Sequence, residues 1–306
     1  MSDALPAYTQ LLDDLAGERA VTAAVLAGLA DDAWDRPSPA EGWLLRDCVV
    51  HLAETDERAA TIAEGEEAPF GRRDPNAGVL TPGMLRGRDL QPAAVYLWWQ
   101  QAGDRMLAAL RRYRGDERLP WAGRSMSVVS FTTARLMEHW SHGLDIHDAA
   151  GVASVDSDRL RHVAQLGFMT RDFAYRTNGL EPPTTPLRVE LTAPSGAQWV
   201  FGPEDAPDRI TGPGGDFCRV VTQRIHWSDT QLAAEGERAQ EFLPKRSPGH
   251  QAPGGRRSRP RTPPADQPQP APRVPLSRHD GEQGRKYLCC DTCRAAACGN
   301  WRRSPR

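Results

Sequence analysis

The chain has 306 residues, of which 39% are hydrophobic and 25% charged, which excludes a collagen-like or wholly disordered protein. The formal net charge of −2 conceals an asymmetry, because residues 244–306 hold 14 Lys and Arg against 4 Asp and Glu, while residues 1–243 hold 24 against 36. Since the body is acidic and offers no basic surface for a phosphate backbone, specific nucleic-acid binding by the folded part is disfavoured.

The N-terminal sequence shows neither a membrane span nor a secretion signal. No run of about 18 apolar residues occurs, and acidic residues appear where a signal peptide would carry basic ones. We therefore expect a soluble, cytoplasmic protein that does not bind membranes. Cys48 and Cys218 are the only cysteines in residues 1–243, so no disulfide framework supports this part of the chain.

Apolar residues recur at spacings of three and four in four segments, which predicts four amphipathic helices. The segments are approximately residues 5–29, 45–62, 91–113 and 126–150. A loop rich in Gly and Pro separates the second segment from the third, and Gly151 provides a terminating glycine for the fourth. Four helices of this length predict a bundle over residues 1–151, whose interior can hold a site made by facing side chains.

The pattern changes after Gly151 and predicts a small α+β domain over residues 152–243. One helix is expected over residues 157–179, and the alternation of Leu187, Val189 and Leu191 followed by a Pro-Ser-Gly turn predicts a β-hairpin with residues 197–201. Asp216 is then expected to cap a short helix. A strand near residues 230–234 and a helix that starts at Glu237 complete the domain.

Residues 244–306 differ in composition from the rest of the chain. Pro and Arg account for 11 and 12 of these 63 residues, and large aliphatic side chains are scarce. Such a segment cannot bury enough apolar area to offset the entropy lost on ordering, so we expect a disordered basic tail. The same composition is typical of an unselected reading frame in a G+C-rich gene, and a frameshifted tail is an alternative interpretation.

The predicted fourth helix carries the most chemical information. Five residues at spacings of 4, 3, 4 and 3 share one of its faces. They are Phe131, Arg135, Glu138, His142 and Asp145. If this face looks into the bundle, its charged groups need partners there, and a divalent cation is one efficient partner for a carboxylate and an imidazole one turn apart. A third ligand is available from His51, which lies among apolar residues of the second helix.

Two histidines and one glutamate form a ligand set found at catalytic zinc, with a fourth position open for water or substrate. Each member also has a structural interpretation, because Glu138 and His142 can form an ordinary surface pair and His51 can be a hydrogen-bonded core imidazole. His139 competes as a ligand because it lies three residues before His142. The motif is not HExxH, since Glu138 precedes both histidines. Spacing alone therefore leaves the metal site and the structural interpretation open.

Two segments together carry a family resemblance. They are Glu41-Gly-Trp leading into Asp47-Cys-Val-Val-His51-Leu-Ala, and Arg135-Leu-Met-Glu138-His-Trp-Ser-His142-Gly-Leu-Asp145. Their sequence resembles the metal-binding N-terminal domain of the mycothiol-dependent maleylpyruvate isomerase family, within the DinB-like four-helix bundles. Residues 157–243 look like the small C-terminal domain of many members. The resemblance implies a mainly α fold, with a DinB-like four-helix bundle followed by a small α+β domain.

In that family a His of the second helix and a Glu and a His of the fourth bind the metal, which implies His51, Glu138 and His142 in this chain. The resemblance also implies mycothiol as a low-molecular-weight thiol cofactor and a small-molecule substrate. In the family's isomerase chemistry the thiolate adds to a cis double bond, which rotates before elimination releases the trans isomer. Other members transfer the thiol. We expect zinc, although iron, nickel and manganese also accept such ligands.

Other charged residues near this motif have two interpretations each. Arg135 could hold a substrate carboxylate, as could Arg224 if it faces the mouth of the bundle, and both are candidates for anion binding. Arg135 could instead pair with Glu138. Asp145 or Asp47 could accept a hydrogen bond from a ligating imidazole, or could pair with a nearby arginine.

The expected function is therefore a mycothiol-dependent isomerase or thiol transferase whose metal activates the thiol. A coordinated thiol loses its proton, whereas a free thiol with a pKa of ~8.5 is mostly neutral at pH 7. The mechanism requires no cysteine of the protein, and Cys48 is expected to be a small buried hydrophobe. The alternative from another class is a non-catalytic metal- or thiol-binding protein that acts as a sensor or scaffold.

Overall fold

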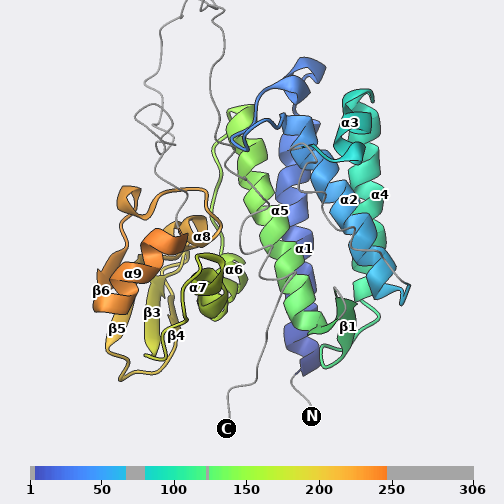
Figure 1. Cartoon of the computed structure of the whole chain (residues 1–306). Coiled ribbons are helices and arrows are strands. Elements are labelled where there is room, and N and C mark those ends of the chain that lie inside the picture. Colours follow the sequence, from blue (N-terminus) through green and yellow to red (C-terminus); the bar gives the residue numbers. More distant parts are fainter. Residues whose placement is uncertain (1–3, 67–79, 122–123, 247–306) are drawn as a thin grey trace, which may run out of the picture.

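The computed structural model describes residues 4–66, 80–121 and 124–246, and these form two parts that lie side by side (Figure 1). The larger part contains four long helices, and the smaller part contains a four-stranded sheet with helices packed on it. The predicted bundle followed by an α+β unit is therefore confirmed. The predicted tail lies outside the described residues from residue 247 onward. Within the described ranges, no helix has the length and apolar character that a membrane span requires.

The bundle is built from helices that match the four predicted segments to within a few residues. They are α1 (Ala4–Ala27), α2 (Leu45–Ala63), α4 (Pro92–Leu110) and α5 (Val128–Ala150). Helix α2 packs mainly on α4, α1 packs on α5, and α2 also contacts α5. Smaller elements complete this part: a 3-10 turn (Asp31–Asp35), α3 (Pro82–Arg88), and a hairpin of β1 (Arg118–Trp121) and β2 (Arg124–Ser127). The contact between α2 and α5 is the one that positions the candidate site.

Local sequence sets both ends of α5, the helix that carries most of the candidate site. Ser127 caps the N-terminus, because its hydroxyl accepts a hydrogen bond from the backbone N–H of Ser130 at 3.1 Å. Gly151 ends the helix with a φ of 71°, a left-handed conformation that glycine adopts at little steric cost. The predicted terminating glycine is thus confirmed.

Apolar side chains of the predicted helix faces fill the core of the bundle. Leu15, Leu52 and Trp99 are fully buried, and burial of one such leucine stabilises the fold by about 1.5–3 kcal/mol. The cluster that contains Leu15 and Phe131 continues through Leu160 into the smaller part. The two parts therefore share one apolar core.

The smaller part follows the predicted order of helix, hairpin and helices. It contains α6 (Leu160–Met169), α7 (Arg171–Thr177), β3 (Leu187–Thr192), β4 (Gln198–Phe201), β5 (Asp208–Pro213), α8 (Gly214–Val221), a 3-10 turn (Trp227–Asp229), β6 (Ala233–Glu235) and α9 (Glu237–Arg246). The strand order is β4-β3-β5-β6. The predicted hairpin is confirmed, since β3 and β4 are antiparallel with Leu191 opposite Trp199. Strand β5, which the sequence did not predict, runs parallel to β3.

Three local predictions in this part were wrong. The helix expected over residues 157–179 divides at Thr170, where φ is −88° and ψ is 16°. The hydroxyl of Thr170 also donates to the carbonyl of Leu166 at 2.8 Å, a contact that bends helices. Asp216 is not the cap of α8, because the helix begins at Gly214 and the carboxylate instead accepts from the N–H of Gln231 at 2.9 Å. The last helix extends beyond residue 243, the expected end of the domain, and includes Pro244 and the residues up to 246, the last that the structure describes.

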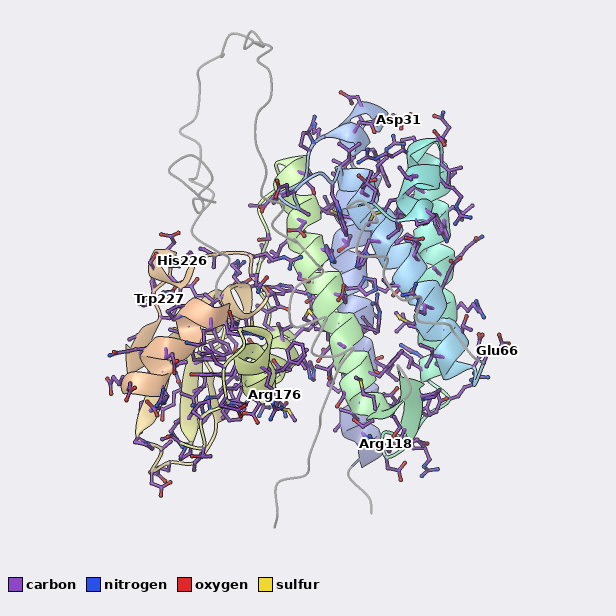
Figure 2. The ribbon with its side chains drawn as sticks, in the orientation of Figure 1. Asp31, Glu66, Arg118, Arg176, His226 and Trp227 are labelled. Carbon is purple, nitrogen blue, oxygen red and sulfur yellow. The ribbon has the colours of Figure 1, made fainter. Side chains whose placement is uncertain are left out.

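Side chains occupy the space between α5 and the smaller part (Figure 2). Two ion pairs also join the smaller part to α1: Arg159, directly before α6, lies 2.7 Å from Glu18, and His162 of α6 lies 2.9 Å from Asp14. Asp31 and Arg118 mark opposite ends of the bundle in the same view. The smaller part thus lies along the side of the bundle, where it can reach residues of α5.

Candidate metal centre

The three predicted ligands meet between α2 and α5. The carboxylate oxygen Oε2 of Glu138 lies 3.2 Å from Nε2 of His51 and 3.5 Å from Nε2 of His142. One donor atom from each residue lies within 4.8 Å of the other two, and each residue is only 5–6% exposed. The structure therefore brings together residues that are 87 positions apart in the chain.

Helix geometry explains this convergence. Glu138 and His142 are one turn apart on α5, so their side chains share a face, and that face lies against α2. His51 projects from α2 toward them, with its ring centroid 4.7 Å from that of His142 in an edge-on arrangement. Of the two histidines on α5 that the sequence offered as ligands, the structure therefore brings His142, and not His139, to His51 and Glu138.

The ligand groups form a tightly coupled charge cluster. Burial alone would raise the pKa of Glu138, but hydrogen bonds from His142 and His51 hold it well below its ordinary value. Burial would likewise lower the pKa of His142, but Asp145, Cys48 and Glu138 hold it well above its ordinary value. Without metal, the carboxylate is therefore ionised and stabilised by a protonated imidazole.

This donor set fits the divalent metal that the resemblance implies. It offers two imidazole nitrogens and one carboxylate oxygen, which suits zinc and leaves one position of a tetrahedral site open. Because an imidazole must be neutral to ligate, binding of a cation here would displace any proton shared between His142 and Glu138. His51, Glu138 and His142 would thus hold the metal.

The smaller part contributes a side chain beside the ligands. Nδ1 of His142 lies 3.1 Å from Asp145, so a proton on Nδ1 bonds this carboxylate and leaves Nε2 directed at Glu138. Arg224 donates to the same Asp145 oxygen at 2.8 Å and lies 3.5 Å from Nδ1 of His142. Gln223 directly before it has a φ of 62°, the sole positive value among described non-glycine residues, and such strained backbone often marks functional sites.

Trp43 covers one side of the two imidazoles. Its ring is stacked on His142, with 5.6 Å between centroids and 18° between planes, and it lies 5.2 Å from the ring of His51. Trp43 is half-buried, so one side of the indole faces the ligands while part of it meets solvent. The sequence motif contained this residue, but the pattern assigned it no role.

Cys48 is fully buried, and its burial raises the pKa of the thiol, in keeping with the expected role as a small hydrophobe. Its sulfur, His142 and Asp145 also lie close enough to form a compact group of donors. Because Arg224 already balances the charge of Asp145, this second group is less suited to a cation than the first.

The structure gives the other predicted residues different partners. Arg135 pairs with Asp56 of α2 at 2.8 Å rather than with Glu138. Asp47 pairs with Arg88 and accepts from the backbone N–H of Leu44 at 2.8 Å, so it is Asp145 that contacts a ligand histidine. Sequence reasoning did not identify Asp56, because it lies among other polar and charged residues between Glu54 and Arg58, where one more carboxylate gives no signal.

Comparison with known proteins gives two matches to family profiles. Residues 15–147 match the profile described as the mycothiol maleylpyruvate isomerase N-terminal domain, which covers all three candidate ligands. Residues 183–235 match a profile described as wyosine base formation, which covers the segment from β3 to β6.

Two relatives and two solved structures extend this finding. Two uncharacterized proteins of Mycobacterium tuberculosis, from strains CDC 1551 / Oshkosh and ATCC 25618 / H37Rv, are each 40% identical over 236 residues, which are 75% of this chain and 91% of theirs. Crystal structures of the mycothiol-dependent maleylpyruvate isomerase and of a histidine-to-alanine mutant share the fold. Each has a TM-score of 0.51 and 19% identity, over 74% of this chain and 92% of that one. The chain therefore belongs to the family defined by the mycothiol maleylpyruvate isomerase N-terminal domain.

Proposed function

We propose that this protein is a divalent-metal-binding, mycothiol-dependent isomerase or thiol transferase that acts on a small molecule. His51, Glu138 and His142 hold the metal, for which zinc suits the ligand set. The observation that carries the proposal is the convergence of three buried donor atoms, each within 4.8 Å of the others. Membership of a family whose solved member is named as mycothiol-dependent supports the choice of thiol.

The residues around the ligands have defined tasks in this proposal. When bound, a divalent cation lowers the pKa of a thiol, so that mycothiol would be present as its thiolate near neutral pH. Asp145 keeps the proton of His142 on Nδ1 and thereby leaves Nε2 free to ligate. Trp43 limits the access of water to the two imidazoles.

Arg224 is the candidate for binding an anionic group of the substrate. It belongs to the smaller part, yet its guanidinium is held by Asp145 within 3.5 Å of His142. Arginine suits a carboxylate because its planar fork can donate two parallel hydrogen bonds. In the proposed isomerisation the thiolate adds to a cis double bond and is eliminated after rotation, so the thiol is recovered. In transfer it stays on the product.

The proposal is tested by metal analysis of the purified protein and of His51→Ala. We expect about one divalent ion per chain in the wild type, and loss of that ion in the variant because one of three protein ligands is missing. His162→Ala is a matched control, since His162 also pairs with a carboxylate but lies on α6. Wild-type protein purified without chelator and free of metal would contradict the proposal.

The thiol is tested separately with the cobalt-substituted protein. Addition of mycothiol should produce a thiolate-to-cobalt charge-transfer band if the open position accepts sulfur. Thiol-dependent turnover of a cis-unsaturated acid then separates an enzyme from a binding protein. If the protein binds metal but shows neither the charge-transfer band nor thiol-dependent turnover, it is a metal-binding protein without the assigned thiol chemistry.

A further inference from the structure

A second buried polar group lies one helical turn from the candidate ligands. Asp56 of α2 accepts from Nη2 of Arg135 at 2.8 Å, and each of its oxygens lies 3.0 Å from Nε2 of His139. Both partners come from α5. Asp56 and His139 are fully buried, and Arg135 is 7% exposed. The group therefore joins the same two helices that carry the three ligands.

Asp56 and Arg135 form the charged part of this group. Burial would raise the pKa of Asp56, but His139 and Arg135 hold it below its ordinary value, so the carboxylate is ionised. Nε2 of His139 faces both oxygens of this carboxylate at 3.0 Å. The result is a buried ion pair of Asp56 with Arg135, completed by the imidazole of His139.

A chain of hydrogen bonds links this group to the backbone of the ligand-bearing turn. Arg135 donates from Nη2 to Oγ1 of Thr55 at 2.9 Å, and Thr55 donates to the carbonyl oxygen of His51 at 2.7 Å. On α5, His139 is the residue after Glu138. A rotation or shift of α2 against α5 would therefore break the bonds to Asp56 and Thr55 as it moved His51 away from Glu138.

The same layer of the bundle extends to the other two helices. The guanidinium of Arg19 on α1 lies 5.4 Å from the ring centroid of Trp99 on α4 and forms an ion pair with Asp104 at 3.0 Å. Gly103 leaves room for it, since a Cβ atom there would lie 2.2 Å from Cζ of Arg19. The Trp99 ring in turn lies 6.4 Å from His139. All four long helices thus meet at one polar layer.

Packing alone does not require such a layer. Removing charges from water is costly, and apolar side chains of similar volume often stabilise a core equally well or better. What an ion pair adds is directional bonding, which can specify one register between helices. A metal site needs that specification, because its ligands come from separate helices and must meet at one point.

We propose that Asp56, Arg135 and His139 are positioning residues that lock the register of α2 against α5 and so hold His51 opposite Glu138 and His142. The inference rests on the proposed metal centre and gives Arg135 a role other than anion binding. None of the three residues needs to touch substrate, which agrees with their burial.

The test compares Asp56→Asn with Glu64→Gln. Both replace a carboxylate by its amide on or directly after α2, and both carboxylates bind an arginine of a neighbouring helix, since Glu64 pairs with Arg105 of α4. In Asp56→Asn we expect zinc affinity, measured by chelator competition, to fall about tenfold or more, as found when groups that orient ligands are changed. Glu64→Gln should stay within about twofold of the wild type, because its pair is partly exposed.

The visible spectrum of the cobalt-substituted protein provides a readout that a loss of stability alone would not change. The bands of Asp56→Asn should shift in position and intensity, and those of Glu64→Gln should match the wild type. All spectra are recorded where circular dichroism shows folded protein. If Asp56→Asn does not fold, Arg135→Lys serves instead, since it keeps the charge but cannot span Asp56 and Thr55 with the same geometry.

Each outcome decides the question. Weaker zinc binding with an altered cobalt spectrum in Asp56→Asn or Arg135→Lys, but not in Glu64→Gln, supports the positioning role. A folded Asp56→Asn, or failing that a folded Arg135→Lys, with wild-type affinity and spectrum overturns it while leaving the metal centre intact. Equal losses in Glu64→Gln also overturn it. Wild-type protein that binds no metal overturns both proposals, because no ligand set would remain to be positioned.

Discussion

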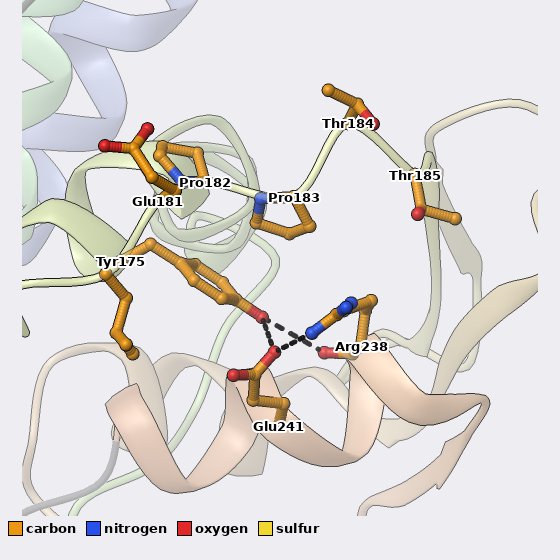
Figure 3. Close-up of a pocket in the computed structure, with 9 residues that line it drawn as sticks. Tyr175, Glu181, Pro182, Pro183, Thr184, Thr185, Arg238 and Glu241 are labelled. Carbon is orange, nitrogen blue, oxygen red and sulfur yellow. Dashed lines mark hydrogen bonds and ion pairs between the residues drawn. The ribbon is translucent and has the colours of Figure 1, made fainter.

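The candidate metal centre and a pocket in the smaller part use the same kinds of residue in opposite surroundings. The pocket, of about 400 Å³, lies between the segment 180–185 and α9 (Figure 3). Within it, Glu241 accepts from the hydroxyl of Tyr175 at 3.1 Å and from Arg238 at 3.0 Å. Its side chain is 29% exposed, whereas that of Glu138 is 8% exposed. Both carboxylates have several partners, but only Glu241 is exposed enough to exchange them for water.

The exposed cluster around Glu241 and the buried cluster around Glu138 therefore contribute differently to the protein. Lys245 and Arg238 lower the pKa of Glu241 to about 2, yet solvent can replace either partner at little cost. If one partner of Glu138 is removed, an uncompensated charge remains buried in the bundle. Pairing at the surface therefore adjusts stability, while pairing in the bundle decides whether the site exists. Four substitutions, given in order of decreasing effect, test this distinction.

The largest effect is expected for His142→Ala, which removes a ligand from the bundle. Zinc affinity should fall by on the order of a hundredfold or more, since about 10–16 kcal/mol is shared among four ligands in structural zinc sites. Thiol-dependent turnover should be lost with it. Chelator competition measures the affinity, and stoichiometric metal retained in this variant would contradict the ligand assignment.

A smaller effect is expected for Asp145→Asn, which keeps the shape of the side chain but removes its charge. His142 then loses the carboxylate that orients its ring, and Arg224 loses its counter-ion. We expect zinc affinity to fall about tenfold. Asp158→Asn is the control, because Asp158 bonds only exposed groups at Ser195. Equal affinities in the two variants would show that the contact to His142 does not orient the ligand.

Trp43→Ala should have a moderate effect, because stacking contacts are worth about 1 kcal/mol. Removal of the indole exposes the rings of His51 and His142 to solvent, and we expect zinc affinity to fall about fivefold. Trp43→Phe should recover most of this loss. An alanine variant with unchanged affinity would mean that the indole is not needed as a wall for the ligands.

The smallest effect is expected for Glu241→Gln in the pocket, and it should depend on pH. The folded pKa is about 2 against an ordinary value of 4.5, so the stabilisation is present above pH 4.5 and is lost as the pH falls toward 2. With partial exposure we expect a loss of about 1 kcal/mol of unfolding free energy at pH 7. Denaturant unfolding at both pH values measures it. If the variant is still less stable than the wild type at pH 2, or if it binds less metal, the contrast between the exposed and the buried cluster is wrong.

Much of the fold could be predicted because its signals are local. The spacing of Leu and Val residues specified the four long helices, and Gly151 specified the end of α5. The spacing of Glu138 and His142 also put them on one helical face, whatever the rest of the chain does. The break at Thr170 was missed because it depends on the conformation of one residue and leaves the spacing of the apolar residues unchanged.

Local sequence accounts for the helices, the hairpin and the shared helical face of Glu138 and His142, because periodicity and capping act within a few residues. The packing of the chain was needed to show that Asp56 faces Arg135 and that Arg224 reaches Asp145 from the other part of the chain. These partners are 79 residues apart in both cases, and such pairs form when buried charges must find a counter-charge in the packed core. That requirement leaves no trace in local spacing.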